Sequence, residues 1–315
     1  MSGGSMPDSP LIAGLGRYDS LTKAIIPSTM NWLPIETSTF GDGERYHRLN
    51  ADVKGRDVVL VCGTIDDQHT MDLYDVSCAV TKYGARSLMM VIPYFGYCTM
   101  ERAVKPGEIV KAKTRARLLS SIPQGSKPNT VLLLDLHAAG IPHYFEDSIK
   151  VHHIYAENEV LLAIRKLIGE RGDIVIGSTD AGERAKWVES LAKKLCLPSS
   201  ICSKQRDKEI VTLKAAPTDV DGKHVIIYDD IFRSCTSLSQ AARAFRAAGA
   251  ISVDAVATHG LSTFDQLKKL IQQNMVSRMM TSDSHPNHRD GYLLMDQYEN
   301  FSIAPLLRDK IQYYL

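Results

Sequence analysis

Short apolar runs alternate along the chain with segments that have the residue pattern of helices. The runs contain Val, Leu and Ile with few polar interruptions, which is typical of strands buried on both faces of a parallel sheet. In the first half, the predicted strands are residues 11–13, 33–36, 58–62 and 87–92, and the predicted helices are 20–26 and 71–83. This alternation predicts an α/β domain with a mainly parallel sheet.

The second half of the chain repeats this pattern. Its predicted strands are residues 131–134, 174–177, 200–202, 225–228 and 253–258, and its predicted helices are 185–195, 238–248 and 304–314. A chain of 315 residues also exceeds the size of one typical core, so we expect two domains. The similarity of the halves suggests a duplicated fold with a break near residues 148–157.

The segment 224–250 carries the most informative polar residues. In order, it contains a predicted buried strand, two adjacent carboxylates (Asp229 and Asp230), three hydroxyl residues (Ser234, Thr236 and Ser237) and a predicted helix. Such a loop can present hydroxyls and backbone N–H groups to a phosphate, while two carboxylates can hold sugar hydroxyls or a hydrated divalent cation. The alternative is an ordinary turn in which the carboxylates are solvated and Ser234 caps the helix. Spacing alone leaves both interpretations open.

Charge and composition narrow the function classes. Lys and Arg total 37 and Asp and Glu total 36, so the formal charge of +1 provides no broad basic field for nucleic acid or anionic lipid. The six cysteines lack CxxC pairs and zinc-site spacing, and we interpret them as reduced thiols of a cytoplasmic protein. Residues 1–10 lack the pattern of a signal peptide, and no apolar run approaches the roughly 20 residues of a membrane span.

Several motifs together resemble the ribose-phosphate pyrophosphokinase family. They are YFGYCTMER at 94–102, VKPGEIVKAKTRARLLSSIP at 104–123, DLHAAGIPHYF at 135–145, STDAG at 178–182, KQR at 204–206 and YDD at 228–230. Their order and approximate spacing match the family from FGDGE at 40–44 to NFSIAPLL at 300–307. The TMER and AKTRARLLS strings are more similar to the plant-type second class, which implies the hypothesis of relaxed selectivity for the diphosphoryl donor.

The resemblance implies a fold and an activity. The fold would comprise two similar phosphoribosyltransferase-type α/β domains, at residues 8–152 and 153–303, each with a mainly parallel sheet flanked by helices. The helix at 304–315 would pack back on the first domain. The activity would be transfer of the diphosphoryl group of ATP to ribose 5-phosphate with Mg²⁺ as cofactor. The protein would be a homo-oligomer without nucleic-acid or membrane partners.

The resemblance also implies an ATP site built from two segments. In FGDGE, the ring of Phe40 would stack on the adenine, and the carboxylates of Asp42 and Glu44 would accept hydrogen bonds from its exocyclic amine. All three residues would come from a neighbouring subunit. The alternative is a surface turn punctuated by glycine. The ATP-binding residues of the second segment would be Thr99, Glu101 and Arg102, within a polar loop at 98–113 suited to closing over a polyphosphate.

Metal and catalytic positions follow from the same resemblance. Asp135, His137 and Asp180 would bind the metal, and His137 would also contact ATP. Lys204 and Arg206 would be catalytic, because cations placed beside the transferring group stabilise its developing charge. Without the family context, a lone His more often has a structural role, and the two cations could be a solvated run.

The ribose 5-phosphate site would comprise Asp180, Asp229, Asp230 and residues 233–237. The five loop residues are Arg233, Ser234, Cys235, Thr236 and Ser237. The family usually has two glycines where this chain has Cys235 and Thr236, and glycine favours positive φ and close approach to phosphate. Arg233 could compensate by pairing with the phosphate. The changed loop motivates one alternative, a catalytically impaired subunit that regulates an active partner. A second alternative is a phosphoribosyltransferase, which the double Asp and the loop would also serve but which would leave FGDGE and DLHA without a role.

Overall fold

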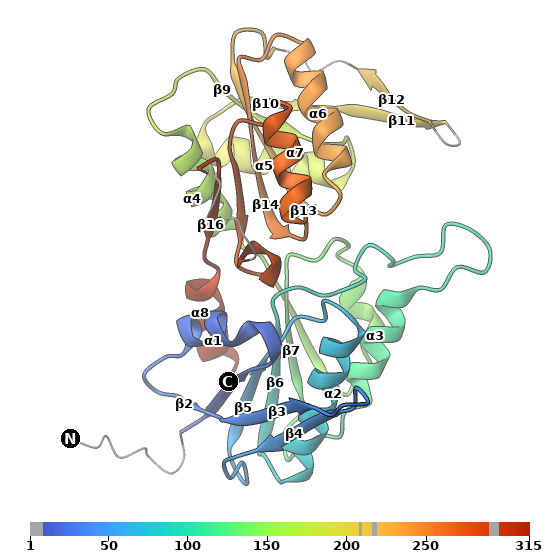
Figure 1. Cartoon of the computed structure of the whole chain (residues 1–315), viewed down its shortest axis with the longest axis vertical. Helices are drawn as coiled ribbons and strands as arrows, with labels where there is room; N and C mark the ends of the chain where they lie inside the picture. Colours follow the sequence, from blue (N-terminus) through green and yellow to red (C-terminus); the bar gives the residue numbers. More distant parts are fainter. Residues whose placement is uncertain (1–8, 208–209, 216–218, 290–295) are drawn as a thin grey trace. The chain divides into compact units, whose positions relative to one another are not determined.

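The chain forms two compact units. The computed structural model in Figure 1 describes residues 9–207, 210–215, 219–289 and 296–315. The first unit comprises Met1–Tyr155 and Ala304–Leu315, and the second comprises Ala156–Ile303. The second unit is therefore inserted into the sequence of the first.

A six-stranded parallel sheet forms the centre of the first unit. In spatial order its strands are β2 (Asn31–Trp32), β1 (Leu11–Gly14), β5 (Asp57–Val61), β6 (Ser87–Ile92), β7 (Thr130–Leu134) and β8 (Lys150–Ile154). Its helices are α1 (Asp19–Ile25), α2 (Asp67–Lys82), α3 (Lys111–Ser120) and α8 (Ala304–Tyr314), with 3-10 turns at Gly16–Tyr18 and Ile141–Tyr144. An antiparallel hairpin of β3 (Ile35–Thr39) and β4 (Arg45–Leu49) is separate from the main sheet.

The second unit contains another six-stranded parallel sheet. Its strands, in spatial order, are β10 (Ser199–Ile201), β9 (Ile174–Ser178), β13 (His224–Phe232), β14 (Ser252–Gly260), β15 (Met279–Ser282) and β16 (Tyr298–Phe301). Its helices are α4 (Glu157–Ile168), α5 (Glu183–Leu195), α6 (Thr236–Ala247) and α7 (Phe264–Gln272), with a 3-10 turn at Pro286–Arg289. The hairpin β11 (Ser203–Asp207) and β12 (Ile210–Ala215) projects from this unit (Figure 1).

The two units have the same topology. Counted along each unit, the second strand of the main sheet lies at one edge, followed by the first, third, fourth, fifth and sixth strands. In both, a separate antiparallel hairpin is inserted between the second and third strands of the main sheet. This correspondence confirms the predicted α/β fold with two similar parallel-sheet domains.

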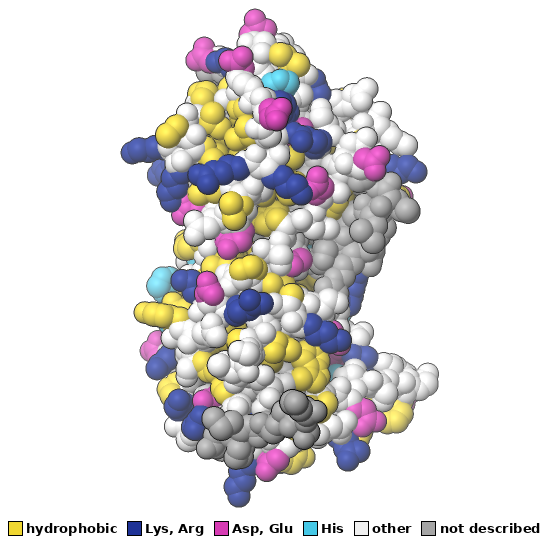
Figure 2. All heavy atoms as spheres, turned by 90° about the vertical axis from the view of Figure 1, so that its left-hand side faces the viewer, with side chains coloured by type: hydrophobic (Ala, Val, Ile, Leu, Met, Phe, Trp, Pro, Cys, Tyr) yellow, Lys and Arg dark blue, Asp and Glu magenta, His cyan; other side chains and the backbone are white. Residues whose placement is uncertain are grey.

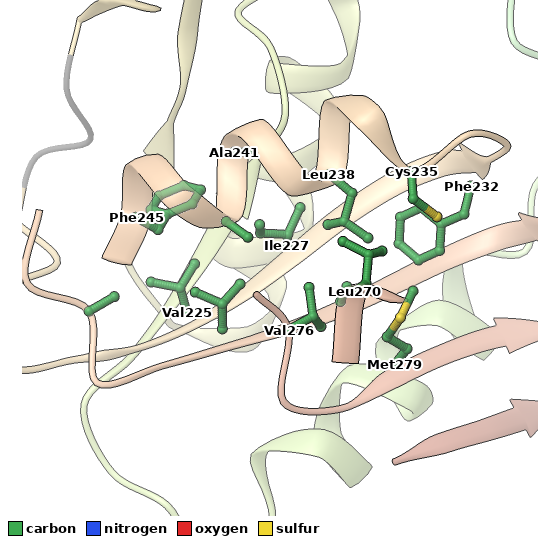
Figure 3. Close-up of a cluster of buried hydrophobic side chains, with 14 of the residues drawn as sticks. Val225, Ile227, Phe232, Cys235, Leu238, Ala241, Phe245, Leu270, Val276 and Met279 are labelled. Atoms are coloured by element: carbon green, nitrogen blue, oxygen red, sulfur yellow. The ribbon is translucent and has the colours of Figure 1, made fainter. Parts of the chain in front are cut away.

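The continuous apolar run at the start of β13 is explained by helices on both faces of the sheet. Val225 and Ile227 pack in one cluster with residues of α6 and α7, whereas Ile226 and Tyr228 pack in the other with residues of α4 and α5. Successive side chains of a strand point to opposite faces, so a strand covered on both faces needs apolar residues at every position. Figure 3 shows Val225 and Ile227 beneath Ala241 and Phe245 of α6.

The structure corrects two boundaries. Strand β13 continues to Phe232 through pairing with β14, so Asp229 and Asp230 lie within the strand and not after it. Strand β8 continues to Ile154, so residues 153 and 154, which the sequence assigned to the second domain, belong to the first sheet. Strand β13 extends beyond its expected end because a neighbouring strand continues to pair with its backbone.

Helix α8 packs in the first unit. Arg308 donates a hydrogen bond from Nε to the carbonyl of Ile25 at 2.9 Å, and a second bond to the carbonyl of Ala24. Leu307 and Ile311 are buried. Because the last carbonyls of α1 lack partners within their own helix, a guanidinium at this position satisfies them.

The surface bears charges of both signs. On the face shown in Figure 2, Lys and Arg side chains are interspersed with Asp and Glu. Among the described residues, every helix is too short or too polar to span a bilayer.

Candidate active site

In the second unit, the loop that follows β9 contacts the carboxyl-terminal part of β13. Thr179 directly follows β9, and its Oγ1 donates to Asp229 Oδ2 at 3.0 Å. Parallel neighbouring strands bring their carboxyl-terminal ends to the same edge, which is where ligands bind in open α/β sheets. The structure therefore brings the STDAG and YDD motifs together.

Asp229 and Asp230 form a buried acidic pair with a basic partner. Arg184 Nη2 lies 2.5 Å from Asp230 Oδ2, and its Nε lies 3.7 Å from Asp229 Oδ1. Burial and the neighbouring Asp230 raise the pKa of Asp229 above its ordinary value, while Arg184 acts in the opposite direction. The residue exposure of Asp230 is 3%, so the interpretation of these carboxylates as solvated groups of a turn was wrong.

Asp180 follows Thr179, the residue that contacts Asp229, and its hydrogen bonds stabilise the loop that enters α5. Its Oδ1 accepts the N–H of Gly182 at 3.0 Å, and its backbone carbonyl accepts the hydroxyl of Ser178. Asp180 is exposed, unlike Asp230. A carboxylate held in this way is accessible to a ligand from solvent.

The loop at 233–237 contains a residue in the left-handed region. Cys235 has φ +57° and ψ 8° and immediately precedes α6. Its side chain is buried beside Phe232 and Leu238 (Figure 3), and its sulfur lies 3.0 Å from Ser262 Oγ. The loop therefore adopts the backbone conformation that glycine would favour, with the thiol directed into the core.

The hydroxyl residues of this loop contact one another. Ser234 Oγ donates to Thr236 Oγ1 at 3.1 Å, and Cys235, at the N-cap position of α6, makes no side-chain cap hydrogen bond. The alternative interpretation, in which Ser234 is the N-cap of the helix, was wrong, because Cys235 occupies that position. Arg233, Ser234, Thr236 and Ser237 are all exposed, so the loop presents polar groups to solvent.

We expect Cys235→Gly to change the free energy of unfolding by less than about 1 kcal/mol, because relief of the left-handed conformation offsets the lost thiol packing. Cys235→Val should destabilise by about 2 kcal/mol, since a β-branched residue resists positive φ. Urea unfolding followed by Trp187 fluorescence checks both values. Equal destabilisation by the two variants would contradict the backbone argument.

Lys204 and Arg206 lie on the β11–β12 hairpin. Lys204 pairs with Leu213 and Arg206 with Val211, so the two positions are two residues apart on one strand and share a face of the hairpin. Their side chains lie outside the described part of the structure.

In the first unit, Asp135 follows β7 in a left-handed backbone conformation. Its φ is +38°, its residue exposure is 6%, and its N–H donates to the carbonyl of Ile154 at 3.0 Å. His137 is exposed two residues later. Non-glycine residues with positive φ are uncommon and cluster at functional sites.

His153 supports the turn between Asp135 and His137. Its Nε2 accepts the N–H of Leu136 at 2.9 Å, and this requires Nε2 to be unprotonated. Burial lowers the pKa of His153 to about 4. No sequence pattern distinguishes this histidine from His152, and its role follows only from the three-dimensional contact.

The shifted pKa of His153 predicts a pH dependence. Because the unfolded chain binds a proton near pH 6.5 and the folded chain only near pH 4, stability should fall as the pH decreases through this window. Allowing for partial exposure, we expect a loss of about 1–2 kcal/mol from this residue between pH 7 and pH 5. Urea unfolding of wild type and His153→Gln at both pH values measures it. An identical pH dependence of the two proteins would contradict the prediction.

The loop at 98–113 has both ends attached to α2. Tyr97, with φ +60°, donates its hydroxyl to Asp67 Oδ1 at 2.8 Å, and Arg115 of α3 pairs with the same carboxylate. Lys111 Nζ lies 4.6 Å from the centre of the Tyr97 ring. These contacts hold the two ends of the loop together at Tyr97 and Asp67. Residues 102–109 between the two ends are exposed.

Three predicted nucleotide-binding residues occur in this loop. Thr99 and Glu101 are half-buried, and Arg102 is exposed. Arg102 Nε lies 3.4 Å from Glu101 Oε1, while Tyr144 donates its hydroxyl to the backbone carbonyl of Glu101. The side chains of Glu101 and Arg102 thus pair with each other.

The FGDGE motif forms the tip of the β3–β4 hairpin. Phe40 is 55% exposed, and Asp42 Oδ1 accepts the N–H of Glu44 at 3.1 Å. Arg45 and His47 of β4 both contact Asp72 on α2, which attaches the hairpin to the unit. Figure 1 shows the hairpin and the long loop between β6 and α3 in different parts of the first unit.

The described residues contain no cluster of three or more His, Cys, Asp or Glu side chains arranged to hold a metal ion. Mg²⁺ commonly keeps several water ligands and binds to one or two carboxylates together with substrate phosphates. The exposed carboxylate of Asp180 in the second unit is accessible for that mode of binding.

Comparison with solved structures defines the class of fold. The chain matches a crystal structure of phosphoribosylpyrophosphate synthetase from Mycobacterium smegmatis with a TM-score of 0.83 and 22% identity, over 97% of this chain and 98% of that one. The class is therefore a two-domain α/β protein with phosphoribosyltransferase-like units.

Sequence comparison defines the family. Residues 13–122 match the N-terminal domain of ribose phosphate pyrophosphokinase, and residues 147–295 match the phosphoribosyl synthetase-associated domain. A ribose-phosphate pyrophosphokinase from Synechocystis is 31% identical over 286 residues, covering 88% of this chain and 81% of the relative. Another from Porphyromonas gingivalis is 32% identical over 250 residues, covering 78% and 77%. The chain belongs to the ribose-phosphate pyrophosphokinase family.

Proposed function

We propose that the protein transfers the diphosphoryl group of ATP to ribose 5-phosphate, giving phosphoribosyl diphosphate and AMP. The observation that supports this most strongly is the match to ribose-phosphate pyrophosphokinases across both units. The acidic pair at Asp229 and Asp230, beside a polar loop at 233–237, offers acceptors for sugar hydroxyls and donors for a phosphate.

In the proposed mechanism, the anomeric hydroxyl of ribose 5-phosphate attacks the β-phosphorus of ATP in line. Asp180, Asp229 and Asp230 hold the sugar, and residues 233–237 bind its 5-phosphate. Lys204 and Arg206 stabilise negative charge on the transferring group as the bond to AMP breaks. This division of roles assigns sugar binding to the second unit.

The first unit would bind the nucleotide. Thr99, Glu101 and Arg102 would contact ATP, and closure of residues 98–113 would exclude water from the reacting diphosphoryl group. Asp135, His137 and Asp180 would hold Mg²⁺, which neutralises phosphate charge when bound. Phe40, Asp42 and Glu44 would contact the adenine from a neighbouring subunit, so we also propose a homo-oligomer.

Two further proposals concern the cellular compartment of the protein and the nucleoside triphosphate that donates the diphosphoryl group. All six cysteines are described and are free thiols, in keeping with a reducing compartment such as the cytoplasm. The TMER and AKTRARLLS strings support a place in the plant-type second class, with acceptance of other nucleoside triphosphates. Formation of GMP from GTP at a rate comparable with AMP from ATP tests the second proposal.

A coupled assay of AMP formation by the purified protein tests the activity. We expect AMP only when ATP, ribose 5-phosphate and Mg²⁺ are all present. If the protein forms no AMP and calorimetry shows no ribose 5-phosphate binding, it is a regulatory subunit and the proposed activity is wrong. No observed feature favours that alternative, since the 233–237 loop forms its left-handed turn without glycine.

A further inference from the structure

The acidic pair at the end of β13 has an unusual electrostatic requirement. Asp229 and Asp230 are adjacent, and their side chains are only 16% and 4% exposed. Two like charges that are both removed from water destabilise each other, so such a pair must take up a proton or face a cation. One candidate for that cation is Mg²⁺, which binds to one or two carboxylates together with substrate phosphates.

Here the cation is a side chain of the protein. Arg184 is the second residue of α5 and is 18% exposed. Its Nη2 lies 2.5 Å from Asp230 Oδ2, and its Nε lies 3.7 Å from Asp229 Oδ1. The guanidinium therefore faces an oxygen of each carboxylate, a geometry that its planar group allows and that a single ammonium reproduces poorly.

Other contacts fix the carboxylate of Asp229. Its Oδ2 accepts the hydroxyl of Thr179 at 3.0 Å, and its Oδ1 accepts the N–H of Asp230 at 2.9 Å. The orientation of this acceptor is thus set by the β9 loop and by β13 itself. Because Arg184 begins the helix that follows the same β9 loop, one short segment supplies both the hydrogen bond and the counter-charge.

We propose that Arg184 is a positioning residue of the sugar-phosphate site and is the permanent counter-ion of Asp229 and Asp230. It offsets the mutual repulsion of the two carboxylates and holds them oriented toward sugar hydroxyls, so the pair does not bind a metal ion of its own. The proposal rests on the proposed function and adds a residue that the motifs did not single out. Asp180 is exposed on the preceding loop and remains the second unit's candidate metal contact.

Calorimetric titration of ribose 5-phosphate tests the positioning role without turnover. Arg184→Met should weaken binding roughly 30-fold or more, because truncating one partner of a buried charge pair leaves the other charges uncompensated. Arg184→Lys should restore part of the affinity through its single charge. Unchanged or tighter binding by Arg184→Met would overturn the proposal and would mean that Arg184 obstructs the site.

A matched control lies at the opposite end of the same sheet. Arg171 pairs with the buried Asp254 near the start of β14, at 2.6 Å. Arg171→Met removes one of the two arginines that pair with the buried Asp254, so it should lower stability while leaving ribose 5-phosphate affinity within about twofold, since it lies outside the site. If Arg171→Met weakened binding as much as Arg184→Met, a general loss of stability would explain both results and the proposal would fail.

Titration with Mn²⁺, followed by electron paramagnetic resonance, tests the counter-ion role independently of any activity. Arg184→Met should bind one more Mn²⁺ than wild type, and Asp230→Asn in that background should abolish the additional site. A Mn²⁺ site in the wild type that Asp230→Asn removes would overturn the proposal. The number of bound Mn²⁺ ions can be measured even if the wild type neither forms AMP nor binds ribose 5-phosphate. In that case the proposed activity fails, while the counter-ion role is still tested.

Discussion

Replacing Lys204 by alanine should lower kcat for AMP formation by roughly 100- to 1,000-fold, the range found when a preorganised charge that stabilises a transition state is removed. The KM for ribose 5-phosphate should change by less than about threefold, because the lost interaction forms mainly as charge develops on the transferring group. Lys204→Arg should retain an intermediate rate. Steady-state kinetics with AMP detection measure all three values.

Gln205 provides the control for this prediction. It lies between Lys204 and Arg206 on β11 and pairs with Thr212, so its position falls on the other face of the same hairpin. Gln205→Ala changes a neighbouring position of the same strand and should leave kcat within about twofold, since this position does not share the face of Lys204. A Lys204→Ala enzyme with more than a tenth of the wild-type kcat would contradict the catalytic assignment.

Asp254→Ala should lower the free energy of unfolding of the second unit by about 3–5 kcal/mol, because breaking a buried ion pair leaves uncompensated charge. The side chain of Asp254 is fully buried and lies 2.6 Å from Arg171 Nη2 and 2.9 Å from Arg278 Nη2. Both arginines also donate to the carbonyl of Leu167 near the end of α4. The carboxylate therefore joins β14, α4 and the segment that enters β15.

The distribution of tryptophan allows this loss to be assigned to one unit. The chain has two tryptophans, Trp32 in the first unit and Trp187 in the second. Urea unfolding followed in Trp32→Phe and Trp187→Phe backgrounds reports on each unit, and the Asp254→Ala shift should be confined to the Trp187 signal. Replacing Arg171 and Arg278 by Met in addition should recover part of the stability, because all three charges are then removed together. A loss below about 1 kcal/mol for Asp254→Ala alone would contradict the account.

Periodicity and motif order predicted the fold well because both depend on local sequence. The apolar run in β13 required helices on both faces of the sheet, and the repeated alternation indicated two similar units. The motifs were sufficient to identify the family. Asp229 and Asp230 could be selected because they follow that run directly.

The remaining features depend on contacts between distant residues. Arg184 lies 45 positions before Asp229, and nothing in its own neighbourhood indicates that it faces the acidic pair. The role of His153 differs from that of His152 because His153 accepts a hydrogen bond from the N–H of Leu136, in the turn that follows β7. The end of β13 was predicted too early because polar residues usually terminate a buried strand, whereas here a tertiary ion pair allows two carboxylates to continue it.

The position of α8 has a consequence for biosynthesis. During translation the ribosome must complete the whole of residues 156–303 before α8 can pack against α1. Until then Leu21 and Ile25, which are buried in the finished protein, belong to an incomplete domain, although the inserted domain can already fold. We therefore expect the later-synthesised domain to mature first, and chaperones that recognise nascent chains to be needed mainly by the amino-terminal one.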